Sequence, residues 1–241
     1  SNKTHEEEIP VYASMGISTK NIIETPIHRV LKEADDNMYR NKLKESINAK
    51  SAVINAFIKK LKKNSHETAQ HLKRMQYIAH KIGVALGLTE GELSRLTLLI
   101  NLHDIGKIHI SEEILLKNAA LDEEEWEAIK RHPETGCRIA RAAEEFAHVA
   151  DEVLSHHEHW DGSGYPRGLK GENIPLLARI IAIADAFEVM SSGRPYRKKL
   201  SKVEVIDELK RCSARQFDPE IVEILLESLE REGWSSYPNY S

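Results

Sequence analysis

Apolar residues recur at helical spacing along most of the chain, which predicts an all-α protein. Residues 28–82 contain neither Gly nor Pro and are rich in Ala, Leu, Lys and Glu, so we expect long helix with one break near residues 64–65. Residues 174–190 are almost entirely apolar, which predicts a buried helix. Two amphipathic helices are expected over residues 203–209 and 221–229.

Two further helix starts are marked by polar residues ahead of apolar runs. Residues 89–92 precede a helix with regularly spaced apolar side chains. Asp122 is followed three residues later by Glu125, which is the spacing of a capping box. Trp126, in the helix that follows, and Met190 are expected in the core.

The N-terminal region differs from the rest. Residues 11–17 alternate as in a strand, and a lone strand needs a partner, either another copy or the remainder of a sheet. Residues 40–63 carry eight Lys or Arg against one acid, and Ile47, Ile54 and Leu61 recur every seven residues. This segment fits a solvated basic connector and a dimerising helix about equally.

The composition favours helices over a β-sandwich. The 241 residues are 41% hydrophobic, 30% charged and only 6% aromatic, whereas a sandwich would need more Val, Thr, Tyr and Phe. The net charge of −4 gives no global attraction for nucleic acid or an anionic membrane. No apolar run reaches the roughly 20 residues that span a bilayer, and no secretory signal heads the sequence. Two cysteines without C-x-x-C spacing exclude a disulfide framework and a thiolate zinc site, and favour the cytoplasm.

The histidines carry the strongest chemical signal. Seven of the 12 lie between residues 103 and 159, and His103-Asp104 stands among mostly apolar neighbours. An unpaired buried charge costs several kcal/mol, so this pair needs a partner. Two alternatives remain at this point. Both side chains bind a metal ion, or they form a hydrogen bond with each other.

Further nitrogen and oxygen donors favour the metal. His156 and His157 form a second adjacent pair, and Asp185 is the only ionised group within residues 180–187. Glu67 and His71 stand four residues apart, on one helix face, and His132 precedes Pro133 at a predicted break. These donors exceed what one ion needs, which indicates two or three divalent ions. Donors without thiolate suit Fe, Mn, Ni or Zn.

Two motifs together resemble a known family. They are His103-Asp104-Ile105-Gly106-Lys107 and His156-His157-Glu158-x-x-Asp161-Gly162-x-Gly164-Tyr165-Pro166. The pair is similar to the HD-GYP family of cyclic di-GMP phosphodiesterases, within the HD superfamily of metal-dependent phosphohydrolases. The resemblance spans residues 64–230 and implies an HD-type helical bundle around a multinuclear metal site. It also implies hydrolysis of cyclic di-GMP to the linear dinucleotide pGpG, with a further cut to GMP where a third ion is bound.

The resemblance extends to individual residues. Glu67 goes with a three-metal centre in that family, and Fe or Mn is the expected metal. Asp104 and Asp185 are expected to hold or orient a bridging water whose pKa the ions lower, and Lys107 to reach the phosphate. The expected metal ligands are Glu67, His71, His103, Asp104, His132, His156, His157 and Asp185. The expected substrate contacts are Lys107, Asp161, Gly164, Tyr165, Pro166, Arg194 and Arg197.

Some of these assignments have open alternatives. The Gly162–Pro166 loop either approaches the substrate closely, with Tyr165 as a wall, or is a structural turn after the His helix. Gly193 departs from the charged residue often found beside Arg194. The activity is either cyclic di-GMP hydrolysis, hydrolysis of another cyclic dinucleotide or other nucleotide, or regulatory binding with little turnover.

The N-terminal part resembles something else. Residues 11–17, with Ala34-Asp35-x-x-Met38-Tyr39-x-x-Lys42, are similar to the last strand and helix of a GGDEF (diguanylate cyclase) domain, without the motif that holds GTP. We therefore expect a GGDEF remnant over residues 1–45, a basic helical connector over 46–63, the phosphodiesterase domain over 64–231 and a tail over 232–241. A homodimer through the N-terminal helix and a GGDEF-type partner domain are the expected associations.

Overall fold

The computed structural model describes residues 69–117, 119–192 and 199–233, with isolated positions between 15 and 56. It divides into two compact units, Ser1–Val53 and Ile54–Ser241, and the second holds all the chemistry discussed below. The expected strand at residues 11–17 and the basic connector lie largely outside the described residues. Of the strand positions only Met15 and Ile17 are described, and neither is in a strand.

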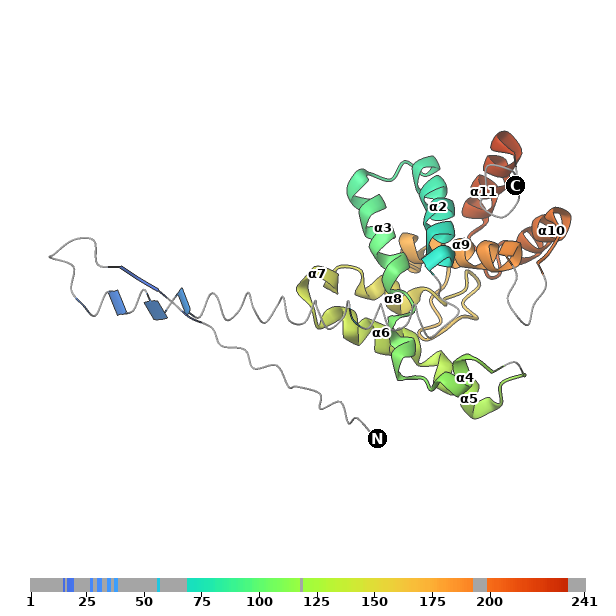
Figure 1. Cartoon of the computed structure of the whole chain (residues 1–241). Helices are drawn as coiled ribbons and strands as arrows, with labels where there is room; N and C mark the ends of the chain where they lie inside the picture. The colour runs from blue at the N-terminus through green and yellow to red at the C-terminus, as the bar shows by residue number, and fades with distance from the viewer. Residues whose placement is uncertain are drawn as a thin grey trace, which may run out of the picture. The chain divides into compact units, whose positions relative to one another are not determined.

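The described part of the second unit is helical, which confirms the all-α prediction. No strand occurs among its described residues, where the only pairing is an isolated bridge between Ser213 and Phe217. Figure 1 shows the arrangement. The elements are α2 (Ala69–Ala85), α3 (Glu90–Leu102), η1 (Ile105–His109), α4 (Glu112–Leu115), α5 (Glu123–Lys130), α6 (His132–Arg141), α7 (Glu144–Ala147), α8 (Ala150–Ser155), η2 (Gly171–Asn173), α9 (Leu176–Ser192), α10 (Lys202–Cys212) and α11 (Pro219–Glu232).

Helix α9 is the central element of the core. It packs against α2, α3, α8, α10 and α11, and its apolar residues Ile180, Ile183 and Phe187 are fully buried (Figure 1). The near-continuous apolar run therefore predicted its burial correctly, because only a helix surrounded on most sides can be apolar on most sides. The helix begins at Leu176, two residues later than expected, and Met190 is buried as predicted.

The predicted helix starts are also confirmed. Asp122 and Glu125 form a reciprocal capping box at the start of α5, so two backbone N–H groups that the helix cannot satisfy gain partners. The same arrangement caps α3 through Thr89. The core assignment of Trp126 is wrong, since this side chain is 44% exposed. Helix α5 buries none of its residues, and its only well-developed packing is against α6.

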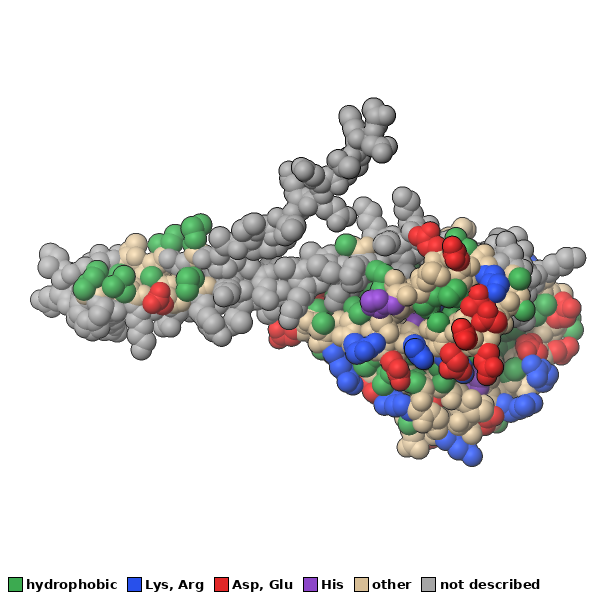
Figure 2. Space-filling view, turned by 90° about the horizontal axis from the view of Figure 1, so that it is seen from below, with side chains coloured by type: hydrophobic (Ala, Val, Ile, Leu, Met, Phe, Trp, Pro, Cys, Tyr) green, Lys and Arg blue, Asp and Glu red, His purple; other side chains and the backbone are tan. Residues whose placement is uncertain are grey.

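The surface carries mixed charge. On the face shown in Figure 2, acidic and basic side chains of the described part are interspersed, as expected for a chain whose net charge is −4. Within the described residues, no helix combines the length and the apolar character needed to cross a membrane.

Candidate metal centre

The first half of the site is built where α3 ends. His103 closes the helix, and Asp104 begins the turn into η1, so both side chains leave the backbone at a buried corner. The Nζ of Lys107 lies 2.5 Å from Oδ2 of Asp104. Burial raises the pKa of Asp104, but the Lys107 ammonium and His103 outweigh this and hold the pKa well below its usual range. Asp104 is therefore a carboxylate at neutral pH.

A glycine contact brings the second half against the first. A Cβ on Gly106 would lie 2.0 Å from the carbonyl O of His132 and 2.6 Å from the N of Gly136, so only glycine allows η1 to approach α6 this closely. Because His132 is the first residue of α6, the contact sets its ring beside Asp104, with His132 Nε2 3.1 Å from Asp104 Oδ1. The predicted break at His132-Pro133 is thus the junction of α5 and α6.

Three imidazoles are oriented by the same local hydrogen bond. In each, Nδ1 faces the backbone carbonyl of the residue three positions earlier, and a carbonyl oxygen only accepts, so Nδ1 carries the proton. A neutral ring then has its lone pair on Nε2. The donors are His103, His132 and His156, and the acceptors are Ile100, Ile129 and Val153, at 2.9, 2.6 and 2.6 Å respectively.

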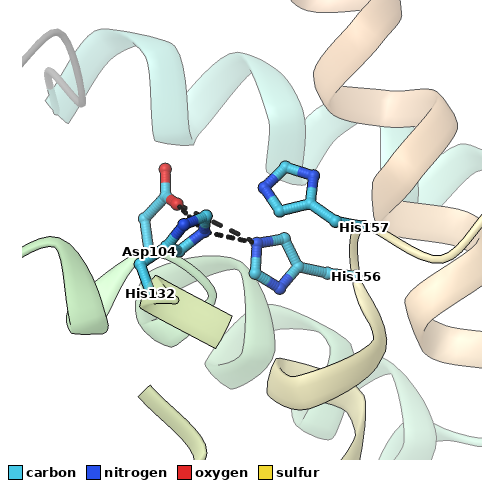
Figure 3. Close-up of side chains that lie close together, drawn as sticks. All are labelled: Asp104, His132, His156 and His157. Atoms are coloured by element: carbon cyan, nitrogen blue, oxygen red, sulfur yellow. Dashed lines mark hydrogen bonds and ion pairs between the residues drawn. The ribbon is translucent and has the colours of Figure 1, made fainter. Parts of the chain in front are cut away.

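These lone pairs converge on the carboxylate. His132 Nε2 lies 3.1 Å from His156 Nε2, and Asp104 Oδ1 lies 3.1 and 3.9 Å from these two nitrogens (Figure 3). Among the described residues no hydrogen bond reaches this buried Oδ1. One ligand atom from each of four residues falls within 4.8 Å of the others, and the four residues are Asp104, His132, His156 and His157.

The cluster fits a divalent cation. Burial and the neighbouring imidazoles lower the pKa of both His156 and His157 well below the usual value, so these rings stay neutral. An internal His–Asp hydrogen bond at Oδ1 would need a second proton on a ring, which the lowered pKa opposes for His156. Neutral imidazoles and a carboxylate therefore face one another with no proton between them. Such nitrogen and oxygen donors suit Fe, Mn, Ni or Zn.

A second group of ligands lies between α2 and α9. His71 Nε2 is 3.5 Å from Asp185 Oδ1, while its Nδ1 contacts the buried carboxylate of Glu188. Arg74 also contacts Glu188, with Nε 2.6 Å from Oε1. Asp185 is not sealed in the core as the apolar run around it suggested, since its side chain is 37% exposed.

A cavity joins the two groups. Its volume is about 120 Å³, and it is lined by Asp185 of α9 as well as by residues of the histidine cluster. A small ligand in this cavity would therefore touch donors of both groups. The lining includes His103, His156, His157, Glu158, His159, Asp185 and Gln216.

The Gly/Pro-rich loop contacts the histidine cluster through Tyr165. The Tyr165 ring stacks on His157, with centroids 4.9 Å apart, and burial raises the pKa of its hydroxyl, so the phenol stays neutral. A Cβ on Gly164 would lie 2.2 Å from the N of His159, which favours the structural-turn interpretation for this glycine. The carboxylate of Asp161 accepts hydrogen bonds from the N and Oγ of Ser163, so it stabilises the same turn. Pro166 follows Tyr165 through a cis peptide bond.

The structure thus brings most of the expected ligands together. His103, Asp104, His132, His156 and His157 form one group, and His71 contacts Asp185, which lines the same cavity as three of these histidines. Glu67, Arg194 and Arg197 lie outside the described residues.

Two buried carboxylates beside the expected ligands were missed by the sequence reasoning. Glu188 follows Asp185 by one helical turn, just beyond the apolar window that drew attention to Asp185. Glu158 belongs to the quoted motif but had no assigned role, and it accepts hydrogen bonds from the backbone N–H groups of Arg167 and Leu169. The sequence did offer one signal for Glu188, because it is an acid one helical turn after the expected ligand Asp185.

Replacing Glu188 tests its role as the buried carboxylate that His71 and Arg74 share. The Glu188→Gln substitution is expected to reduce the free energy of unfolding by about 3 kcal/mol, because it leaves the largely buried Arg74 guanidinium without its carboxylate. Urea denaturation measures this loss. Glu208→Gln breaks a more exposed Glu–Arg pair and is expected to change stability little. Equal effects of the two substitutions would contradict the assignment.

The same pair predicts a pH dependence. Burial raises the pKa of Glu188, but hydrogen bonds from His71, Ser192 and Arg74 outweigh it and lower the pKa from 4.5 to about 2. The carboxylate therefore stabilises the folded state above pH 4.5, and this contribution is lost as the pH falls toward 2. The stability difference between wild type and Glu188→Gln should shrink over the same interval.

The fold and donor set define a helical protein with a buried nitrogen and oxygen site suited to divalent metal ions. The sequence model of the HD domain matches residues 55–221, which is more than half of the chain. The chain therefore belongs to the HD-domain family.

Curated relatives match about two thirds of the chain. A Thermotoga maritima protein named cyclic di-GMP phosphodiesterase is 40% identical over 168 residues, covering 69% of this chain and 45% of the relative. The Vibrio cholerae protein named 3'3'-cGAMP-specific phosphodiesterase 2 is 38% identical over 165 residues, covering 68% of this chain and 32% of the relative. The chain spans less than half the length of these two relatives.

Solved structures agree on the fold. A cyclic GMP-AMP specific phosphodiesterase of V. cholerae (V-cGAP3) is 26% identical with a TM-score of 0.52, covering 69% of this chain and 45% of that one. The Bdellovibrio bacteriovorus protein Bd1817 is 16% identical with a TM-score of 0.55, covering 88% of this chain and 75% of that one. At this lower identity the likeness concerns the fold alone.

Proposed function

We propose that the chain is an HD-GYP-type, metal-dependent phosphodiesterase that hydrolyses cyclic di-GMP. The observation that carries the proposal is the convergence of imidazole Nε2 atoms on an ionised, buried carboxylate beside a small cavity. The names of the curated relatives, among them cyclic di-GMP phosphodiesterase, support the substrate class.

The expected ligands would hold two or three ions, with Fe or Mn favoured. Bound divalent ions lower the pKa of water and neutralise charge on a phosphodiester. Asp104, as the ionised carboxylate of the histidine cluster, would be shared between ions, and Asp185 would complete the site from α9. Glu188 would keep the Nε2 of His71 directed at the site, because its carboxylate fixes the proton on Nδ1. Glu67 would add a donor for a third ion.

The remaining residues would bind and orient the substrate. Lys107 stands beside Asp104 as a positive charge that a phosphate oxygen could share. Tyr165, stacked on His157, would limit access of bulk water to the reacting phosphate. Arg194 and Arg197 would contact the second phosphate bidentately. Asp161 and Gly164 would keep the loop in the conformation that holds Tyr165 in place, and Pro166 would contact the substrate beside Tyr165.

The other expectations concern the protein beyond the metal centre, and we propose them together with its function. They comprise the domain boundaries 1–45, 46–63, 64–231 and 232–241, the GGDEF-like N-terminal remnant with a GGDEF-type partner domain, a homodimer through the N-terminal helix, and a cytoplasmic location. Size-exclusion chromatography with light scattering on the full chain and on a chain beginning at residue 64 tests the dimer.

A second candidate substrate is 3'3'-cGAMP. The observation that favours it is that relatives named as specific for this dinucleotide are 38% and 35% identical to the chain. Both substrates present the same phosphodiester linkage and differ in one purine base.

Product analysis distinguishes these activities. The metal-reconstituted protein is incubated separately with cyclic di-GMP and with 3'3'-cGAMP, and the products are separated by chromatography. We expect cyclic di-GMP to yield pGpG or GMP at the higher kcat/KM, and a chelator to abolish the reaction. Faster turnover of 3'3'-cGAMP would favour the second candidate. Binding of cyclic di-GMP without turnover would instead indicate a regulatory module.

A further inference from the structure

The loop between α10 and α11 is held rigidly against the His-containing motif. Gln216 N donates to Cys212 O at 2.9 Å, and Gln216 O accepts from Trp160 N at 3.2 Å, so both backbone polar groups of Gln216 are fixed. Asp161 N donates to Arg215 O at 2.8 Å in the same way. The backbone of residue 216 is therefore positioned by the segment that directly follows His156, His157 and Glu158.

Strain and an ion pair reinforce this placement. Ala214 has φ of 59°, a left-handed conformation that a non-glycine residue adopts only when its surroundings impose it. The start of α11 is anchored by Asp218, whose Oδ2 lies 2.5 Å from Arg179 of α9. The guanidinium of Arg179 also lies over the Trp160 ring, 5.7 Å from its centroid. The loop is thus tied to α9 and to the site loop at once.

Gln216 is one of the residues at the cavity beside the histidine cluster. It lines this cavity together with His103, His157 and Asp185. Its amide makes no hydrogen bond with the described residues, and the side chain is half-buried. The lining also includes Ala182 and Ala186 of α9, whose side chains are small.

We propose that Gln216 contacts a purine base of the substrate and contributes to its selection. The inference rests on the proposed function. Metal ions held by the histidine cluster would engage phosphate, whereas a neutral carboxamide offers one acceptor and two donors. That set matches the hydrogen-bonding edge of a purine, where donors and acceptors stand side by side. A fixed loop favours such a contact, because the backbone that carries the side chain is in place before the substrate binds.

The test compares a nucleotide with a phosphodiester that has no base. Cyclic di-GMP and bis(p-nitrophenyl) phosphate are given to metal-reconstituted wild type, Gln216→Ala and the control Gln76→Ala, a half-buried glutamine of α2 that does not line the cavity. Loss of one neutral hydrogen bond is expected to lower kcat/KM for cyclic di-GMP by about 3- to 10-fold. Turnover of bis(p-nitrophenyl) phosphate and the metal content should stay as in wild type.

Two outcomes overturn the inference. One is an equal loss on both compounds, which would make Gln216 a structural support of the centre, and the other is no loss on cyclic di-GMP. A wild type that cleaves bis(p-nitrophenyl) phosphate but not cyclic di-GMP would instead refute the proposed function. Equilibrium binding of cyclic di-GMP then tests Gln216 alone. Weaker binding to Gln216→Ala than to wild type supports the contact, and equal or undetectable binding overturns it.

Discussion

Asp104→Asn is expected to lower turnover of cyclic di-GMP by about 1,000-fold or more and to lower the metal content of the purified protein. Asp104 is the only carboxylate within the histidine cluster of the described residues, and its negative charge is what a cation there would balance. Removing several kcal/mol of charge stabilisation corresponds to a loss of this size. Turnover and metal analysis by mass spectrometry on the same preparation measure both effects.

The fold of this variant should be retained. The new amide can donate to the facing imidazole lone pairs, so the metal-free cluster is relieved of some repulsion. Circular dichroism and thermal unfolding check this point. Asp207→Asn, at an exposed acid of α10, is the matched control and should leave metal content and turnover unchanged. Unchanged metal content and turnover in Asp104→Asn would contradict the assignment of the centre.

Gly106→Ala is expected to lower the free energy of unfolding by about 3 kcal/mol or more and to reduce turnover at least about 100-fold. The added Cβ would lie 2.0 Å from the carbonyl O of His132, and backbone atoms cannot rotate away as a flexible side chain does. Relief of the overlap must move η1 away from α6. This movement separates Asp104 from His132, so stability and metal binding should fall together.

The control is another glycine-to-alanine change. A Cβ on Gly91, in the first turn of α3, would meet only Thr89 Oγ1 at 4.0 Å. Gly91→Ala should therefore be neutral or slightly stabilising, because alanine favours the helix. Urea denaturation of both variants gives the comparison. A Gly106→Ala protein as stable as wild type would show that the η1–α6 contact does not determine the geometry of the site.

The helices that the sequence predicted well are those with an unambiguous local signal. The apolar run of α9 and the capping box at Asp122 each depend on residues within one or two helical turns. Both patterns can therefore be recognised in the sequence alone. Burial of Trp126 was expected from its aromatic side chain, without regard to where its helix lies. Helix α5 makes extensive contacts with α6 only, so Trp126 stays 44% exposed. Hydrophobic type is a preference for burial that tertiary packing can override.

The site was predicted as a set of residues but not as a geometry. Sequence motifs identified Asp104, His132 and His156, yet the proximity of η1 to α6 depends on Gly106, whose role requires the backbone contact to be seen. Gln216 carried no signal at all, because it reaches the cavity only through a loop that pairs with Trp160. Contacts between segments distant in the chain are set by packing, which local patterns do not encode.

The central claim is that this buried cluster is a metal centre that hydrolyses cyclic di-GMP. Its most direct test is a titration of metal-free protein with Mn²⁺ or Fe²⁺ under anaerobic conditions, with bound metal per chain and pGpG formation measured on each sample. Turnover should be absent without metal, rise as metal binds and saturate at two or three ions per chain. Turnover by the metal-free protein, or intact cyclic di-GMP at two or more bound ions per chain, would contradict the account.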